Sequence, residues 1–374
     1  MTDEATQAAP AFTPDDMRFM ALALDLGRRG LGRTAPNPAV GAVIVKDGVI
    51  VGRGWTQDGG RPHAEVEALN RAKRAARGAT MYVTLEPCSH QGETPPCADA
   101  VIKAGIARVV SAMDDPNPQV AGQGHARLRE KNIAVEVGLL ADEARLAHAG
   151  HIARVTQGRP RVLVKLAVST DGKVAREGRK PIQITGEEAR ERVFRMRAQN
   201  DAILVGIGTV LADNPQLTCR LPGMLERSPV RVVLDAQLRT PLSLSVISTN
   251  REYPTWVFCS DKASEMAEDI LAQKGVRVFR VPEVNGKLDL GAVLKRLDAE
   301  GITRLMVEGG PTVAASFVSA GLVDEVALLR GAVTIGANGI DALAGMKLDA
   351  LTEGMTALDS EKLGVDTLAH YGRT

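Results

Sequence analysis

Four side chains in the first third of the chain combine the residue types that hold a catalytic metal ion. His63 and Glu65 lie at the expected start of a helix, Cys88 follows an expected strand, and Cys97 opens the next expected helix. Catalytic zinc is typically held by three protein ligands with water in the fourth position, whereas structural zinc usually has four protein ligands. One histidine and two cysteines therefore predict a catalytic zinc site.

Glu65 is interpreted as a proton carrier and not as a ligand. Zinc lowers the pKa of a bound water, so hydroxide can attack an amidine-like ring carbon while a carboxylate passes a proton to the departing amine. The positive ends of the two helix dipoles favour the thiolate forms that zinc requires. The alternative is that His63 only caps a helix and that the cysteines are small buried apolar residues.

Length and composition indicate the class of protein. A chain of 374 residues exceeds one ordinary core, which predicts two domains, and 44% hydrophobic residues is normal for a globular protein. No run of apolar residues approaches the roughly 18 that a membrane helix needs. The first residues include Asp3 and Glu4, whereas a secretory signal peptide begins with basic residues. We therefore expect a cytoplasmic protein without a membrane partner.

The charge balance favours a small-molecule substrate. The chain has 46 basic and 45 acidic side chains, so it lacks the broad positive field that binds a nucleic acid backbone. Aromatic residues make up 3% of the chain and leave few platforms on which bases could stack. We therefore expect no nucleic-acid partner.

The apolar patterns predict two α/β domains in series. Residues 1–13 form an expected flexible tail, residues 14–156 the first domain and residues 157–374 the second. The boundary lies where residues 147–160 lose clear periodicity and end in Gly158-Arg159-Pro160. In the first domain, Asp47-Gly48 predicts a tight hairpin between two short strands.

Strands and helices alternate in the second domain, which predicts a mainly parallel sheet with helices on its faces. Buried-type strands are expected at residues 162–168, 202–205, 230–234, 255–259 and 304–307. Helices are expected at residues 186–198, 262–273, 290–299 and 312–320. The segment after Gly336 contains no chemical signal that we can interpret.

A possible phosphate-binding turn is the main chemical signal of the second domain. An expected strand at residues 304–308 is followed by Gly309-Gly310, and Pro311 opens a helix. Glycine admits close backbone approach, and a helix N-terminus offers free N–H groups to a phosphate. By itself this connection is also a common tight turn. A Rossmann fingerprint is excluded, because Leu211 stands where its third glycine would follow Gly206.

The motif H-A-E at residues 63–65, followed by T-L-E-P-C-S-H-Q-G-E-T-P-P-C at residues 84–97, resembles the cytidine-deaminase-like superfamily. Eight residues separate the two cysteines instead of two, and this spacing resembles the bifunctional deaminase/reductase family of riboflavin biosynthesis. The segments P-N-P-A-V-G at residues 36–41 and D-P-N-P at residues 115–118 also fit. The resemblance implies a cytidine-deaminase-like three-layer α/β/α domain.

In that family the matching residues have defined roles. The resemblance implies one Zn²⁺ per chain on His63, Cys88 and Cys97, with Glu65 as the catalytic residue. It implies that Asn37 and His90 contact the substrate. From the residues alone, asparagine also makes ordinary turns and a loop histidine is often only solvated.

The second half resembles the reductase domain of the same family. The matching segments are K-L-A-V-S-T-D-G at 165–172, V-L-A-D-N-P-Q-L-T at 210–218 and V-E-G-G-P-T at 307–312. The resemblance implies a dihydrofolate-reductase-like α/β fold that uses NADPH. The implied NADPH contacts are Ala167, Gln183, Thr209, Asp213, Gly310, Pro311, Thr312, Val313, Ala314, Ala315 and Ser316. The implied substrate contacts are Arg197, Leu217, Arg220 and Glu308.

Two features leave alternatives open in this half. Arg197 could lie on a solvated helix face, because Glu191 and Arg195 already form a pair at helical spacing. The family often has Ser-x-Trp-Ile-Thr where this chain has P-I-Q-I-T at residues 181–185. Pro181 therefore lacks a hydroxyl that would contact substrate, and Gln183 cannot stack as an indole would.

The resemblance implies two consecutive reactions of flavin synthesis. The first removes an amino group as ammonia from 2,5-diamino-6-(5-phosphoribosylamino)pyrimidin-4-one. The second uses NADPH to reduce the ribosyl chain, giving 5-amino-6-(5-phosphoribitylamino)uracil. We expect a homo-oligomer that acts on this phosphorylated pyrimidine. The rival hypotheses are a deaminase with a reductase domain that has lost activity, and a binding or scaffold protein with structural zinc.

Overall fold

The computed structural model describes residues 12–179 and 182–373, and the chain divides into two compact units after Gln157. Most of the expected tail and Pro181 lie outside the described residues. Thr13 caps the first helix, where its side chain accepts a hydrogen bond from the Asp16 N–H and the Asp16 carboxylate accepts one from the Thr13 N–H. Within the described ranges, every helix is too short or too polar to cross a bilayer.

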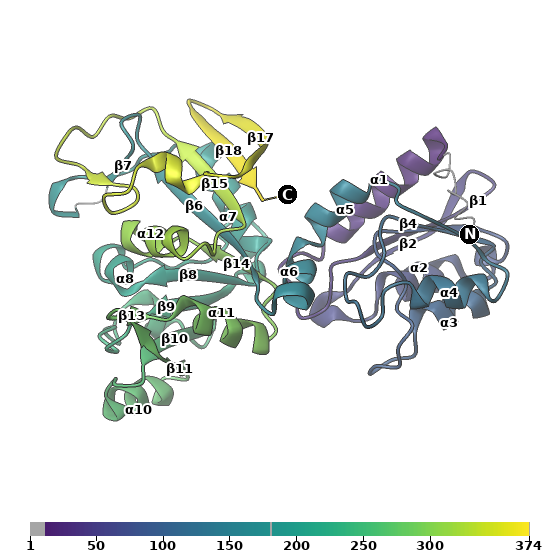
Figure 1. Cartoon of the computed structure of the whole chain (residues 1–374), viewed down its shortest axis with the longest axis horizontal. Helices are drawn as coiled ribbons and strands as arrows, with labels where there is room; N and C mark the ends of the chain where they lie inside the picture. Colours follow the sequence, from purple (N-terminus) through teal and green to yellow (C-terminus); the bar gives the residue numbers. More distant parts are fainter. Residues whose placement is uncertain (1–11, 180–181, 374) are drawn as a thin grey trace, which may run out of the picture. The chain divides into compact units, whose positions relative to one another are not determined.

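The first unit contains a five-stranded sheet in the order β2-β1-β3-β4-β5, which can be followed in Figure 1. Its strands are β1 (Gly41–Lys46), β2 (Val49–Trp55), β3 (Thr80–Val83), β4 (Arg108–Ser111) and β5 (Ala134–Val137). Its helices are α1 (Pro14–Arg28), α2 (Ala64–Ala72), α3 (Cys97–Ala104), α4 (Gln123–Arg129), α5 (Ala141–Ala147) and α6 (Ala149–Gln157).

Helices cover both faces of this sheet, because successive strand residues point to opposite faces. Ile44 packs with α2, α3 and α4 in one buried cluster, whereas Val43 packs with α1 and α5 in the other. The predicted hairpin is also present, since both Asp47 and Gly48 have positive φ, as a two-residue type I′ turn requires. The expected three-layer α/β/α architecture is confirmed.

One helix of this unit was not predicted. The sequence shows no clear periodicity over residues 147–160, yet α6 occupies Ala149–Gln157. The helix buries only small residues, Ala149, Gly150 and Ala153, so its inner face carries no large apolar side chains that a periodicity search would detect.

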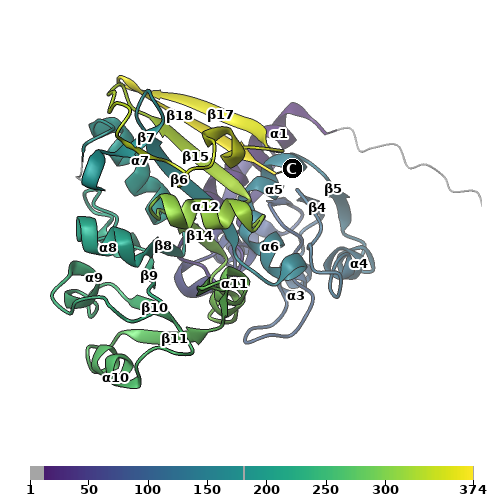
Figure 2. The ribbon, with the colours of Figure 1, turned by 60° about the vertical axis from the view of Figure 1, so that its left-hand side comes forward.

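The second unit is built on a nine-stranded sheet in the order β11-β10-β9-β8-β14-β6-β15-β18-β17, with β17 and β18 at one edge in Figure 2. These strands are β6 (Arg161–Val168), β8 (Ala202–Gly206), β9 (Val230–Leu234), β10 (Thr255–Ser260), β11 (Arg277–Val281), β14 (Arg304–Val307), β15 (Glu325–Arg330), β17 (Thr356–Leu363) and β18 (Asp366–Gly372). Two small pairs join β7 (Lys173–Ala175) to β16 (Ile340–Asp341), and β12 (Glu283–Val284) to β13 (Lys287–Leu288).

The expected mainly parallel sheet is confirmed. In this sheet all pairings from β11 across to β15 are parallel, and β18 pairs antiparallel with both β15 and β17. One face packs against α11 (Leu290–Ala299) and α12 (Pro311–Ser319). The other face packs against α7 (Glu187–Ala198), α8 (Ile207–Asp213), α9 (Ser245–Ser248) and α10 (Glu265–Gln273).

Candidate active sites

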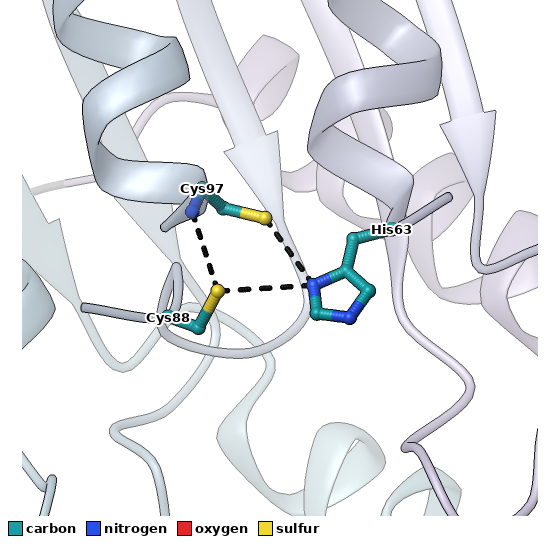
Figure 3. Close-up of side chains that lie close together, drawn as sticks. All are labelled: His63, Cys88 and Cys97. Atoms are coloured by element: carbon teal, nitrogen blue, oxygen red, sulfur yellow. Dashed lines mark hydrogen bonds between the residues drawn. The ribbon is translucent and has the colours of Figure 1, made fainter. Parts of the chain in front are cut away.

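The three expected zinc ligands converge at the starts of two helices. His63 is the N-cap residue of α2, Cys97 is the first residue of α3, and Cys88 lies in the loop that follows β3. Figure 3 shows the three side chains pointing toward one another, with Nδ1 of His63 facing both sulfurs. This nitrogen is 3.3 Å from Cys97 Sγ and 3.8 Å from Cys88 Sγ. The three donor atoms therefore enclose one small space.

The donor set fits zinc. All three donor atoms lie within 4.8 Å of one another, and within the described part of the chain no fourth His, Cys, Asp or Glu completes the group. One imidazole nitrogen and two sulfurs are ligands that zinc prefers, and a set of three leaves a coordination position for water. The geometry thus favours a catalytic site over a structural one.

Hydrogen bonds stabilise the thiolate form of one cysteine. The Cys97 side chain, and then His63, lower the pKa of Cys88 to about 4, although burial opposes this shift. The backbone N–H of Cys97 also donates to Cys88 Sγ at 3.2 Å. The side-chain interaction with Cys88, then burial, and then the negative charge of Glu65 raise the pKa of Cys97. The protein itself therefore favours the thiolate form of Cys88, which is the form that binds zinc.

Glu65 lies in the first turn of α2 and is 3% exposed. Burial, and then the negative charge of Cys88, raise the pKa of its carboxyl group to about 7. The carboxyl group also interacts with the Cys97 side chain. Glu65 is not part of the three-residue ligand set, so its carboxyl group is available to exchange protons beside it.

The two expected substrate residues of this half are connected to the segments that carry the ligands. Asn37 packs closely against Gly60, where no side chain larger than hydrogen would fit, and Gly60 precedes His63 by three residues. His90 is exposed, two residues after Cys88, and its charge acts on Asp115. Asn37 therefore packs against the loop that leads to His63, and His90 lies in the loop that carries Cys88.

Glu86 was missed as a functional residue. It is 5% exposed, and its carboxylate accepts hydrogen bonds from the backbone N–H groups of Asp115, Gly122 and His125 at 2.9, 2.8 and 3.1 Å. These bonds fasten the loop after β4 to the segment that carries Cys88. The sequence feature that could have identified Glu86 is its position as an acidic residue directly before Pro87-Cys88, in a segment otherwise expected to be buried.

The second unit contains a cavity of about 1630 Å³, at the carboxyl ends of the parallel strands β8, β9 and β14. Ligands of open α/β sheets bind at this edge. Most expected cofactor and substrate residues line the cavity: Ala167, Gln183, Arg197, Thr209, Asp213, Leu217, Glu308, Gly310, Pro311, Thr312, Val313, Ala315 and Ser316. Most of the cofactor and substrate residues predicted from the sequence therefore line one cavity.

Two expected residues do not line this cavity. The Ala314 side chain is buried in the core, so only its main chain could meet a cofactor. Arg220 instead lies over the Phe194 ring, 4.8 Å from its centroid. Its pKa is lowered by burial and by the positive charges of Arg197 and Arg190, which shows that these cations are close together.

Arg197 is not on a solvated helix face. It is 9% exposed, and its guanidinium donates to both carboxylate oxygens of Glu308 at 2.7 and 3.0 Å and to the Thr218 carbonyl at 3.0 Å. Lys165 Nζ lies 3.6 Å from the same carboxylate. Burial raises the pKa of Glu308, but the charges of Arg197 and Lys165 outweigh it and hold the pKa at about 2. Glu308 therefore stays ionised.

Lys165 and Arg190 are cavity residues that were not predicted individually. Lys165 interrupts the apolar run of β6, and a charged residue inside a buried strand was the available signal. Arg190 belongs to a helix of low overall hydrophobicity and high charge, where nothing distinguishes one arginine from its neighbours.

The glycine turn after β14 connects two parts of the expected cofactor site. Gly310 caps α12, and its N–H donates to Thr209 Oγ1 of α8 at 3.1 Å. A Cβ atom at Gly309 would lie 2.6 Å from the Cβ of Val313, which is closer than packed atoms approach. Close packing of this turn therefore requires glycine at position 309, whether or not a phosphate binds there.

Gln183 lines the cavity, and its Nε2 donates only a long hydrogen bond of 3.4 Å to the Thr185 carbonyl. It is exposed, so its side chain is free to turn toward a ligand. Pro181, the other departure from the family pattern, lies outside the described residues.

Comparison with known proteins identifies both halves. Residues 13–113 match the cytidine and deoxycytidylate deaminase zinc-binding region, and residues 160–369 match the RibD C-terminal domain. The chain is 41% identical over 368 residues to riboflavin biosynthesis protein RibD of Escherichia coli (strain K12), which covers 95% of this chain and 98% of that protein. The chain belongs to the RibD family.

Other RibD proteins agree with this assignment. RibD of Aquifex aeolicus (strain VF5) is 45% identical over 311 residues, covering 83% of this chain and 85% of that protein. The solved structure of Acinetobacter baumannii RibD, form 2, matches with a TM-score of 0.84 and 36% identity over 96% of this chain and 99% of that chain. A deaminase/reductase from Thermotoga maritima matches with a TM-score of 0.83 and 35% identity over the same shares.

Membership of the RibD family makes the chain a bifunctional enzyme of riboflavin biosynthesis, with a zinc-dependent deaminase half and a reductase half that uses NADPH. It is thus both a hydrolase and an oxidoreductase. The family, the two-domain α/β fold and the two activities inferred from the motifs are confirmed. The hypothesis of a scaffold protein with structural zinc is not supported.

Proposed function

We propose that the chain deaminates 2,5-diamino-6-(5-phosphoribosylamino)pyrimidin-4-one and then reduces the product to 5-amino-6-(5-phosphoribitylamino)uracil. The observation that carries the first step is the three-ligand set of His63, Cys88 and Cys97 with the buried carboxyl group of Glu65 beside it. The Thermotoga maritima relative is described as a diaminohydroxyphosphoribosylaminopyrimidine deaminase and 5-amino-6-(5-phosphoribosylamino)uracil reductase, which supports this choice of substrate.

In the deaminase half, the protein holds the metal and moves a proton. Zinc, when bound by the three ligands, makes water a nucleophile at neutral pH. Glu65 would move the protons of the attacking water, one to the amino group, which would leave as ammonia, and one to the ring nitrogen, while the water oxygen becomes the ring carbonyl. Asn37 and His90 are proposed to orient the pyrimidine. Asn37 packs against Gly60, three residues before His63, and His90 lies two residues after Cys88.

In the reductase half, we assign the phosphorylated sugar to the end of the cavity near Arg197. Lys165, Arg190 and Arg197 bring three positive charges to this end, with Arg220 nearby, whereas Glu308 brings one negative charge. The excess of positive charge suits a phosphate group. Glu308 fixes the orientation of Arg197 and Lys165, and Leu217 lines the same end of the cavity.

NADPH is assigned to the remainder of the cavity and supplies the hydride when bound. Thr209, Asp213 and the segment from Gly310 to Ser316 line this part, with only the main chain of Ala314 accessible. The free N–H groups at the start of α12 suit the pyrophosphate. Ala167 and Gln183 line the wall nearer to Lys165.

Two cations at the far end of the cavity suit the additional phosphate that distinguishes NADPH from NADH. Arg239 is exposed on the loop after β9, and Lys287 is exposed on β13, and both line the cavity. Two hydrogen bonds close the loop of Arg239, because one Asp235 carboxylate oxygen accepts from both the N–H and the hydroxyl of Thr240 at 2.8 Å. Among the described residues neither cation forms an ion pair.

We also propose that the enzyme works in the cytoplasm as a homo-oligomer on a small-molecule pyrimidine and not on nucleic acid. The near balance of basic and acidic side chains supports a small-molecule substrate. Light scattering of the purified enzyme tests the oligomeric state, and a monomer at micromolar concentration would contradict it.

The direct test follows ammonia release and NADPH absorbance together in one reaction with the diaminopyrimidinone substrate. The proposal predicts that ammonia appears first and that NADPH is then consumed in a one-to-one ratio. Ammonia without NADPH consumption would contradict the second step, and the absence of both signals would contradict the substrate assignment.

A further inference from the structure

A short loop at residues 213–217 connects the two ligand regions proposed for the reductase cavity. Asp213 is the last residue of α8, and Leu217 follows it by four residues. Both line the cavity, together with Pro215 between them. Asp213 is assigned above to NADPH and Leu217 to the substrate. The position of this loop therefore affects both proposed ligands.

Two residues of the 213–217 loop have backbone conformations that are unusual for residues other than glycine. Asn214 has φ 41° and ψ 55°, in the left-handed region, and Leu217 has φ 60°. Such conformations cost free energy and persist only where surrounding contacts hold them. The contacts of this loop with its neighbours therefore determine its shape.

Helix α9, which is labelled in Figure 2, supplies these contacts. The side-chain oxygen of Asn214 accepts a hydrogen bond from the N–H of Ser245, the first residue of α9, at 2.7 Å. Leu217 is 3% exposed and belongs to the same buried apolar cluster as Val246 of α9. The 213–217 loop is thus attached to α9 near both of its ends.

A fully buried arginine holds α9 in turn. Arg231 of β9 is 0% exposed. Its guanidinium donates to the carbonyls of Ser245 and Val246 at 3.3 and 3.1 Å, and to Thr249 Oγ1 at 2.9 Å. It also donates to the carbonyl of Gln216, in the loop itself, at 3.4 Å. Because buried polar groups need hydrogen-bond partners, Arg231 connects the loop and α9 to the central sheet.

We propose that Asn214 is a positioning residue of the reductase, whose hydrogen bond with Ser245 holds Asp213 and Leu217 where they meet NADPH and the substrate. This inference rests on the proposed function, which assigns both ligands to the cavity. Asn214 does not itself line the cavity, so it acts through its neighbours. Without this bond, fewer molecules hold the loop in the binding-competent conformation, and the apparent affinity for both ligands falls in proportion.

The experiment removes this hydrogen bond from either side and measures NADPH oxidation with the deaminated intermediate supplied. Asn214→Gly removes the acceptor and leaves a residue that adopts positive φ readily. Ser245→Pro removes the donor, because proline lacks an N–H and is tolerated at the first position of a helix. Leu244 before it is already extended, as the residue before proline prefers. Each variant is expected to raise the KM for NADPH and the KM for the intermediate about fivefold, with kcat changed less than about twofold.

A double variant and a conservative variant test whether the bond itself is responsible. Asn214→Gly combined with Ser245→Pro is expected to show the same rise of about fivefold, and not the roughly 25-fold rise of two independent effects, because both changes remove one bond. Asn214→Asp keeps an acceptor oxygen and is expected to stay within about twofold of the wild-type KM values. If Ser245→Pro does not fold, the comparison of Asn214→Gly with Asn214→Asp remains.

Controls separate this role from folding. Asn132→Gly changes another exposed asparagine with positive φ, in the deaminase unit, and is expected to match the wild type in both KM values. Ammonia release reports the deaminase unit and is expected to be unchanged in every variant. Thermal unfolding followed by circular dichroism identifies any variant that does not fold.

Unchanged KM values in both Asn214→Gly and Ser245→Pro would overturn the inference. So would a double variant whose KM rises by the product of the two single effects, or an equal penalty in Asn214→Asp and Asn214→Gly. A fall in kcat alone would also overturn it, because that result indicates a general loss of active enzyme. Absence of NADPH oxidation by the wild-type enzyme with the supplied intermediate would instead contradict the proposed function.

Discussion

The Arg197 guanidinium binds both carboxylate oxygens of Glu308, with N–O distances of 2.7 and 3.0 Å, in the lining of the reductase cavity. Lys165 lies 3.6 Å from the same carboxylate. Glu308 therefore organises two cations that would otherwise be buried near each other. Because this arrangement belongs to the second unit alone, changes to it are expected to affect reduction and not deamination.

Replacing Glu308 with glutamine is expected to lower the rate of NADPH oxidation by at least about tenfold while ammonia release stays at the wild-type rate. Glutamine keeps the approximate shape but leaves Arg197 and Lys165 without a buried counter-charge. The two rates are measured in parallel on one preparation. Equal loss of both activities would show that the variant acts through global unfolding.

The same carboxylate predicts a dependence of stability on acidity. Its pKa is lowered from 4.5 to about 2, so its stabilising effect is present above pH 4.5 and is lost as the pH falls toward 2. The full effect is about 3 kcal/mol, at 1.36 kcal/mol per pKa unit. Hydrogen exchange of the β14 amides between pH 5 and pH 2.5 measures it. The Glu308→Gln variant should lack this contribution, and an unchanged pH profile in that variant would contradict the assignment.

Replacing Cys88 with serine is expected to reduce bound zinc from one ion per chain to nearly none, because a hydroxyl is a poor zinc ligand. The matched control is Cys259→Ala, which changes a fully buried thiol in the second unit and should retain zinc. Metal analysis after dialysis measures both. Retention of zinc by Cys88→Ser would remove Cys88 from the ligand set.

A methyl group at Gly309 is expected to weaken NADPH binding and to slow reduction by at least about tenfold. The added Cβ would lie 2.6 Å from the Cβ of Val313, so the start of α12 must move away from β14. Binding is measured by titrating Gly309→Ala with NADPH, and ammonia release serves as the internal control. Normal NADPH affinity would show that this turn does not contact the cofactor.

Arg239→Ala is expected to raise the KM for NADPH by about tenfold or more and to leave the KM for NADH nearly unchanged, since only NADPH carries the additional phosphate. Lys287→Ala should have a smaller effect in the same direction, because an ammonium group makes fewer directed hydrogen bonds than a guanidinium. Equal changes for both cofactors would indicate a general effect on the cavity and contradict the assignment.

The zinc site was predictable because its residue types and positions are local signals. His63 and Cys97 stand at helix starts that the sequence itself indicates, and the structure brings them together with Cys88. The alternation of apolar segments likewise predicted the parallel sheet, because buried parallel strands read as continuous apolar runs.

Features that depend on packing between distant segments were missed. The resemblance named Arg197 as a substrate contact, but its pairing with Glu308 of β14, which excludes a solvated helix face, could not be predicted from its own helix. Helix α6 buries only alanine and glycine, so its pattern was too weak to detect, and the position of His151 beside Asp115 was hidden with it. The edge strands β17 and β18 were also missed, because most residues of β17 are exposed and lack an apolar pattern.

The most direct test of two separate sites acting in order uses Glu65→Gln with two different starting compounds. Supplied with the diaminopyrimidinone substrate, this variant is expected to retain zinc, release no ammonia and consume no NADPH. Supplied with the deaminated intermediate, it is expected to oxidise NADPH at the wild-type rate. With the diaminopyrimidinone substrate, undiminished ammonia release or any NADPH oxidation by the variant would contradict the account, and so would the absence of NADPH oxidation with the intermediate.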